Sequence, residues 1–151
     1  MPDTIMSTEL PRIDGPQAWT SRVQVARGDW SYTLSADDVA EIDSALAGVR
    51  DIEILDIDKS AFPLPGLSSR LAEVKREILD GRGFFLFRGL PIACYSTAEA
   101  ARIFWGLGTH WGEAVSQNGK GHVLGHVKDL GLDYADPMAR GYQTSARLPF
   151  H

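Results

Sequence analysis

A short apolar run, Phe84-Phe-Leu-Phe87, lies between two turn-forming clusters of this chain. Gly81-Arg-Gly83 precedes the run, and Gly89-Leu-Pro91 follows it. Four residues are too few for a helix, and a run without alternating polar residues is typical of a strand that is buried on both faces. The sequence therefore predicts a strand in the middle of a sheet.

Three amphipathic helices are expected around this strand. The first begins at Ser35, which forms a capping-box pattern with Asp38, and Gly48 is expected to end it in the left-handed conformation. Its apolar stripe recurs at spacings of three and four residues: Val39, Ile42, Leu46 and Val49.

The second helix is expected to be capped by Ser68 or Ser69 and to stop at Gly81-Arg-Gly83. The third has the complete capping box Ser96-Thr-Ala-Glu99 and is expected to end at Gly108. The apolar stripes predicted for these helices are Leu71, Val74 and Ile78 in the second, and Ala100, Ile103, Phe104 and Leu107 in the third.

The segments between the helices carry fewer signals. Residues 52–57 predict a short extended segment, and residues 122–128 predict a strand. The two prolines of Phe62-Pro-Leu-Pro-Gly66 exclude a helix there. Residues 109–121 and 129–145 are predicted to be loops, and functional residues are expected in them because loops carry sites more often than the elements they join.

Composition limits the class of protein. With 151 residues, 44% of them hydrophobic, the chain has the size of one globular domain. Its net charge of −5 argues against a general nucleic-acid binder, and its apolar runs fall far below the ~20 residues of a membrane span. The single cysteine, Cys94, is expected to be a buried, inert thiol in a protein of the reducing cytoplasm. Residues 1–15 are expected to form a loose leader.

The chain has four histidines: His110, His122, His126 and His151. Two of them, His122 and His126, have the spacing at which a helix places both imidazoles on one metal ion. The residues between them, Val123, Leu124 and Gly125, with Gly121 just before, favour a strand, in which four residues span about 13 Å. Ordinary sheet histidines are therefore the favoured interpretation, with a shared metal site as the alternative.

Several segments, in order, resemble the taurine dioxygenase (TauD/TfdA-like) family. They are Gly81–Pro91, Tyr95–Ala100, Trp105–Gly108, Gln117-Asn118, Val127-Lys-Asp129, Arg140-Gly-Tyr142 and Leu148-Pro-Phe-His151. The resemblance covers residues 60–151 well and residues 16–50 more loosely.

The resemblance implies an α+β protein, the N-terminal part of a double-stranded β-helix (jelly-roll, clavaminate synthase-like) fold with flanking helices. It implies a non-haem Fe(II), 2-oxoglutarate-dependent dioxygenase, an oxidoreductase whose iron is held by two histidines and a carboxylate. His151 matches the first of these ligands. The loop that begins at Thr109 lacks the histidine-tyrosine pattern of taurine-specific members, which leaves the small-molecule substrate open. The polar candidates to line its pocket are Gln117, Asn118, Tyr142 and Arg147, for which bracing of the loops is the alternative role.

The chain departs from the family pattern at its end. The carboxylate expected two residues after His151, the distal histidine and the arginine that would bind 2-oxoglutarate are not among the 151 residues. We therefore expect residues 16–151 to be the N-terminal part of one dioxygenase domain, in a truncated sequence that is inactive alone. A non-catalytic binding or scaffold remnant of the same fold is the alternative, and the oligomeric state stays open.

Overall fold

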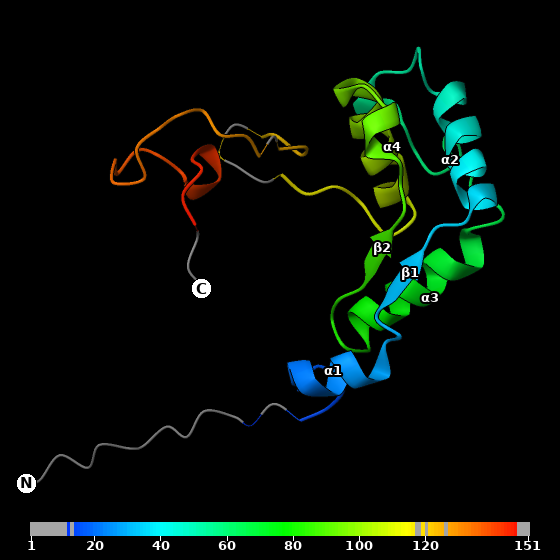
Figure 1. Ribbon diagram of the computed structural model, residues 1–151. Coiled ribbons are helices and arrows are strands. Elements are labelled where there is room, and N and C mark those ends of the chain that lie inside the picture. The colour runs from blue at the N-terminus through cyan, green and yellow to red at the C-terminus, as the bar shows by residue number, and fades with distance from the viewer. Residues whose placement is uncertain (1–11, 13, 117–118, 120, 126, 148–151) are drawn as a thin grey trace, which may run out of the picture. The chain divides into compact units, whose positions relative to one another are not determined.

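The computed structural model describes residues 12, 14–116, 119, 121–125 and 127–147. The chain divides into two compact units, Met1–Glu113 and Ala114–His151. The elements described in the first unit are α1 (Ser21–Arg27), β1 (Ser31–Thr33), α2 (Ala36–Gly48), η1 (Ile54–Asp56), α3 (Ser68–Leu79), β2 (Leu86–Arg88), η2 (Ile92–Cys94) and α4 (Thr97–Thr109) (Figure 1). The second unit contains η3 (Gly141–Gln143). This mixture of helices and strands is consistent with the α+β class.

Helix α2 begins as predicted. The Ser35 hydroxyl accepts the Asp38 N–H at 3.1 Å, and Asp38 accepts the Ser35 N–H at 2.8 Å, which completes the capping box. The predicted end is wrong, because Gly48 is still helical and the helix is capped by Val49 with φ −115°. Val49 is fully buried, so packing of its side chain continues the helical path without a left-handed glycine.

Helix α4 also begins with its predicted capping box, in which Ser96 and Glu99 bond each other's backbone N–H. Ile103 is buried as predicted, whereas Phe104 is 69% exposed, which corrects the predicted stripe. The buried face runs through Ile103 and Gly106 instead. The helix continues one residue past Gly108, the predicted end, to Thr109.

Helix α3 buries Leu71 and Val74 as predicted, but Ile78, in its last turn, is 39% exposed. Neither serine caps its start: Leu67 occupies the N-cap position, and the Ser68 hydroxyl donates to the Pro65 carbonyl at 2.8 Å. The helix stops at Leu79, ahead of the predicted end at Gly81.

Strands β1 and β2 pair in parallel, with Tyr32 opposite Phe87. Within the described residues β1 is the one partner of β2, so the predicted place in the middle of a sheet is wrong for this part of the chain. Leu86 and Arg88 are exposed and Phe87 between them is half-buried, so β2 alternates as a strand with one covered face does.

Two other predicted extended segments are not found. Residues 54–56 form the turn η1, whose backbone bonds Asp56 N–H to Glu53 O at 2.9 Å. Of residues 122–128, those that the structure describes form no strand. Gly121 before them has φ +80°, a conformation that leaves the extended region, and Gly125 has no side chain to pack on a sheet. His122 is therefore not a sheet histidine, and His126 lies outside the described residues.

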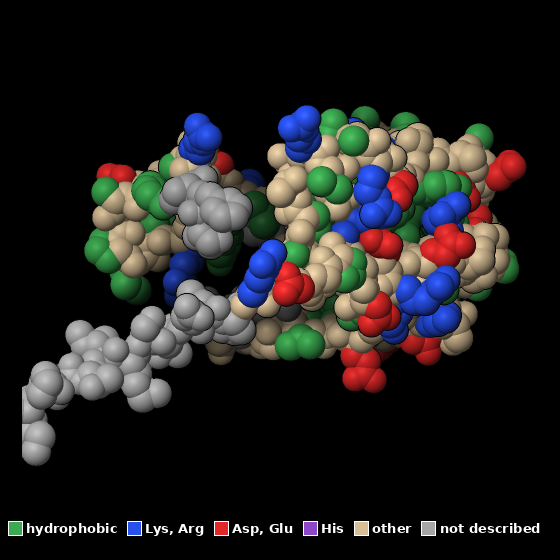
Figure 2. Space-filling view, turned by 90° about the horizontal axis from the view of Figure 1, so that it is seen from below, with side chains coloured by type: hydrophobic (Ala, Val, Ile, Leu, Met, Phe, Trp, Pro, Cys, Tyr) green, Lys and Arg blue, Asp and Glu red, His purple; other side chains and the backbone are tan. Residues whose placement is uncertain are grey.

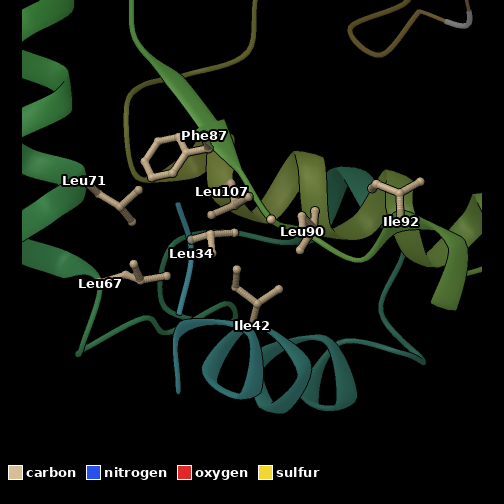
Figure 3. A pocket seen from close by; sticks show the side chains of 9 residues that line it. Leu34, Ile42, Leu67, Leu71, Phe87, Leu90, Ile92 and Leu107 are labelled. Carbon is tan, nitrogen blue, oxygen red and sulfur yellow. The ribbon is translucent and has the colours of Figure 1, made fainter. Parts of the chain in front are cut away.

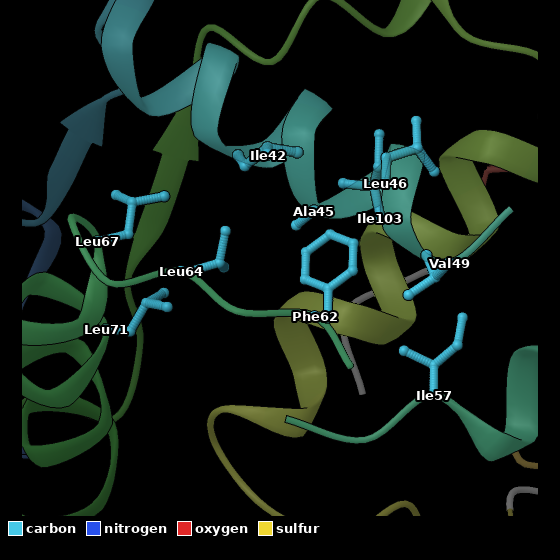
Figure 4. Packing of buried hydrophobic residues seen from close by; sticks show 10 residues of the cluster. All are labelled: Ile42, Ala45, Leu46, Val49, Ile57, Phe62, Leu64, Leu67, Leu71 and Ile103. Carbon is cyan, nitrogen blue, oxygen red and sulfur yellow. The ribbon is translucent and has the colours of Figure 1, made fainter. Parts of the chain in front are cut away.

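The core of the first unit lies between α2, α3 and α4 (Figure 4). Its buried members are Ile42, Ala45, Leu46, Val49, Ile57, Phe62, Leu64, Leu67, Leu71 and Ile103. Phe62 is fully buried and packs against Gly106, where an added Cβ atom would lie 2.4 Å from the nearest atom of the ring. The described residues contain no helix long and apolar enough to cross a membrane.

Candidate functional site

Three of the predicted site residues, Gln117, Asn118 and His151, lie outside the described residues. The other two, Tyr142 and Arg147, are both in the second unit and both exposed, Tyr142 at 46%. Tyr142 is in the middle of the turn η3, which is closed by a hydrogen bond from Gln143 N–H to Arg140 O at 2.8 Å. The side chain of Gln143 accepts from Arg140 N–H at 3.0 Å. This reciprocal bonding fixes the backbone that carries Tyr142.

Acidic side chains shape the rest of the second unit. Asp129, Asp133 and Asp136 each accept a backbone N–H two residues further on, at 2.7–2.9 Å. Such bonds are typical of Asx turns, so these carboxylates stabilise the loop. The described residues hold no group of three or more His, Cys, Asp or Glu side chains that could bind a metal ion.

His110, at the end of α4, has a structural contact. Its Nε2 lies 2.9 Å from the Phe62 carbonyl oxygen, and because a carbonyl only accepts, Nε2 carries the proton. Trp105 Nε1 donates to Ile57 O at 2.9 Å, and Trp111 Nε1 donates to Leu71 O at 3.1 Å. Three rings, one in the second half of α4 and two directly after its end, thus bind the segment from residue 57 to residue 71.

An apolar pocket of about 310 Å³ opens in the first unit (Figure 3). Its wall is aliphatic or aromatic apart from one glycine: Leu34, Ile42, Leu67, Leu71, Phe87, Gly89, Leu90, Ile92 and Leu107. At Gly89, φ is +87° and a Cβ atom would lie 3.3 Å from the Leu34 carbonyl oxygen. Glycine is therefore required where the chain turns at the pocket. With no titratable side chain in its wall, the pocket can hold an apolar group but cannot transfer a proton.

Glu41 of α2 positions one wall of this pocket. Its two carboxylate oxygens accept the backbone N–H groups of Gly66 at 2.6 Å and Leu67 at 3.0 Å. These N–H groups lie at the start of α3, so Glu41 takes the role that a capping side chain would have. Sequence reasoning missed this residue, because the groups that it bonds lie 25 and 26 residues further along the chain.

Tyr95 directly follows η2, the turn that contributes Ile92 to the pocket wall, and fixes the end of that turn. Its hydroxyl donates to Asp43 of α2 at 2.8 Å. Burial, and then the hydrogen bond to Asp43, raise the pKa of Tyr95 to about 12, so the phenol stays neutral at ordinary pH. Its neighbour Cys94 is exposed, which corrects the prediction of a buried thiol: η2 turns that side chain outward.

A second hollow, of about 420 Å³, lies between α2 and the proline-containing segment. It is lined by Glu41, Ser44, Ala45, Gly48, Ser60, Ala61, Pro63 and Pro65. Its one charged side chain, Glu41, already binds the start of α3. This hollow therefore follows from the packing of small residues against α2.

Two curated proteins are similar to this chain. It is 31% identical over 143 residues to FR-33289 synthase of Streptomyces rubellomurinus, and 27% identical over 149 residues to taurine hydroxylase-like protein SAT17 of Stachybotrys chartarum. The matches include 92% and 93% of this chain, which spans 42% and 39% of the two relatives. No protein-family model matches the sequence. The two relatives point to the TauD-like dioxygenase family.

Proposed function

We propose that this chain is the N-terminal part of a TauD-like oxidoreductase, a non-haem Fe(II), 2-oxoglutarate-dependent dioxygenase that hydroxylates a small organic substrate. The observation that carries the proposal is the similarity to FR-33289 synthase, which extends over 92% of the chain. The similarity to a taurine hydroxylase-like protein, over 93% of the chain, supports the same chemistry. In this proposal residues 16–151 form the first part of one jelly-roll domain.

The described residues do not by themselves fit an iron ion, since they include no cluster of three potential ligands. His151, which lies outside them, is proposed as the first ligand, and in this proposal the second histidine and the carboxylate would come from polypeptide beyond residue 151. With these three ligands the protein would hold Fe(II), and the ion would supply the oxidising chemistry with 2-oxoglutarate and O₂.

The chain's own contribution is positioning. The apolar pocket of the first unit offers a surface on which an apolar group can be buried. In the second unit the guanidinium of Arg147 and the hydroxyl of Tyr142 are exposed and can bind the polar groups of a substrate. Gln117 and Asn118 complete the proposed set of substrate-binding residues.

The test is the replacement of His151 by alanine in a chain continued to the length of the relatives. We expect His151→Ala to lose bound Fe(II) and succinate release from 2-oxoglutarate. The matched control is His122→Ala, since His122 is exposed and has no carboxylate two residues later. Retention of iron by His151→Ala, with loss in His122→Ala, would contradict the ligand assignment.

A non-catalytic binding module is the second candidate, and the apolar pocket without a titratable side chain favours it. The same experiment separates the two functions. A continued chain that binds neither Fe(II) nor 2-oxoglutarate, and that still binds an apolar ligand, would support the binding module and refute the dioxygenase.

A further inference from the structure

Arg82 is buried although it carries a charge, with 5% of its surface exposed. It lies in the turn between α3 and β2, and its guanidinium contacts three side chains. Nη1 donates to Asp29 at 2.8 Å and to Gln24 at 3.3 Å, and Nε donates to Glu77 of α3. The Arg82 carbonyl accepts the indole N–H of Trp19 at 2.8 Å. Three of these four partners, Trp19, Gln24 and Asp29, belong to the N-terminal segment 15–29.

The other residues of segment 15–29 pack only weakly against the first unit. Gln24 is the only residue that α1 buries, while Val23 and Val25 are 50% and 74% exposed. The Trp19 ring contacts Phe84 at a centroid distance of 4.8 Å. A helix of seven residues does not persist in water without tertiary contacts, so α1 depends on Arg82 and Phe84 for its structure.

The core of the unit does not include this segment. Its buried residues, and the partly buried residues packed against them, fall between Tyr32 and Trp111. Release of segment 15–29 would therefore leave the packing of α2, α3 and α4 unchanged, as in a local opening reaction.

Opening would also return charged groups to water. Asp29 is half-exposed. More generally, Figure 2 shows acidic and basic side chains beside one another on one face of the molecule. Hydrogen bonds from Arg82 lower the pKa of both Asp29 and Glu77, which keeps the two carboxylates ionised at ordinary pH. In the open state, water hydrates Arg82 and its charged partners. This hydration offsets part of the attraction between Arg82 and the carboxylates that opening removes, so the closed and open states can exchange.

We propose that segment 15–29 is a strap, latched by the guanidinium of Arg82, that opens as a unit and uncovers the aromatic surface at Phe84. The strap is a conformational device of the first unit and does not depend on the proposed catalytic function. Its open state presents Phe84 and the Arg82 side chain, which the closed state covers with Trp19, Gln24 and Asp29.

Hydrogen–deuterium exchange of the full 151-residue chain, read by mass spectrometry, tests the latch. In Arg82→Gln we expect amides of α1 to exchange about tenfold faster, a change equivalent to 1.4 kcal/mol of opening free energy, with α2 and α4 unchanged. Arg76→Gln is the matched control, because Arg76 is an exposed arginine of α3 and its loss removes the same charge. This control should leave exchange in α1 as in the parent.

Two further variants keep the test decisive if Arg82→Gln does not fold. Asp29→Asn weakens the latch from the strap side, and Trp19→Phe removes the N–H donor while keeping a ring against Phe84. Each should accelerate exchange in α1 alone. The proposal is overturned if α1 exchanges at the parent rate in these variants, or if α2 and α4 accelerate together with α1, which would make Arg82 part of the core.

Discussion

The contact between Phe62 and Gly106 shows how one side chain sets the distance between a loop and a helix. A Cβ atom at Gly106 would lie 2.4–2.6 Å from three atoms of the Phe62 ring. The ring is fully buried and is held among α2 and α4 residues, so it has no open space into which to move. The glycine is thus required by packing, since its φ is not positive.

Gly106→Ala is therefore expected to destabilise the chain by about 1–3 kcal/mol, the usual cost of overpacking a core. The measurement is the urea midpoint at constant slope. Gly108→Ala, two residues further along α4, is the matched control because its Cβ atom would meet nothing within 4 Å. Alanine there should stabilise the helix by about 0.5–1 kcal/mol. Equal effects at the two positions would contradict this account of the Phe62 contact.

At the scale of an element, the start of α2 combines a cap with a tertiary contact. Asp38 accepts hydrogen bonds from the backbone and hydroxyl of Ser35 and from the Tyr32 hydroxyl, all at 2.8–2.9 Å. Burial opposes ionisation of Asp38, but these hydrogen bonds outweigh it and lower the pKa below its ordinary value of 3.8. The ionised carboxylate therefore stabilises the folded state.

Asp38→Asn is expected to reduce stability by about 1 kcal/mol at neutral pH, because a neutral amide accepts the hydrogen bonds of the capping box less strongly than the carboxylate does. Because the folded pKa is lowered, the parent's advantage is complete above the ordinary pKa of 3.8 and declines as the pH falls through the lower, folded value. Unfolding midpoints at pH 7, 5 and 3 measure this decline. Asp37→Asn, in the same turn, is the control and should show a smaller loss at pH 7. A parent advantage that grows in acid would contradict the assignment.

The elements differ in how far the sequence predicts them. The starts of α2 and α4 were predicted correctly because a capping box is made of residues three apart, and both partners are visible in the sequence. The start of α3 at Ser68 is also close to the predicted position, but its capping group is not visible in the local sequence, because Glu41, which accepts the N–H groups there, is 25 residues away from Gly66. The exposed position of Phe104 could not be predicted either, since the choice between neighbouring helix faces depended on the close approach of Phe62 to Gly106.

The candidate site was predicted less completely than the helices. The apolar pocket could not be predicted because its wall comes from β2, from the helices α2, α3 and α4, from η2 and from the short segments beside them, each with an ordinary apolar pattern. Tyr142 and Arg147 are exposed, and their role in substrate binding stays a prediction. The assignments of His151, Gln117 and Asn118 rest on the family resemblance, since their placement is outside the described residues.

For the molecule as a whole, the decisive feature is that the chain forms two units, Met1–Glu113 and Ala114–His151. The buried core and the apolar residues packed against it lie entirely in the first unit, with Trp111 as the last of them. The contacts that connect the end of α4 to the core, from His110 to Phe62 O and from Trp111 to Leu71 O, also fall before residue 113. The stability of the first unit should therefore depend little on the residues that follow it.

A chain that ends at Glu113 is expected to unfold cooperatively with a Tm within about 4 °C of the full chain, a difference of less than about 1 kcal/mol. A chain that ends at Thr109 is the matched comparison, because it loses only four more residues but both ring contacts, of His110 and Trp111. Two lost hydrogen bonds and the apolar surface of residues such as Phe87, which Trp111 no longer covers, should lower its stability by about 2–4 kcal/mol. Calorimetry of the three chains measures these differences. If removal of residues 114–151 abolishes the cooperative transition, the two units stabilise each other, and the core described between Tyr32 and Trp111 is not sufficient for folding.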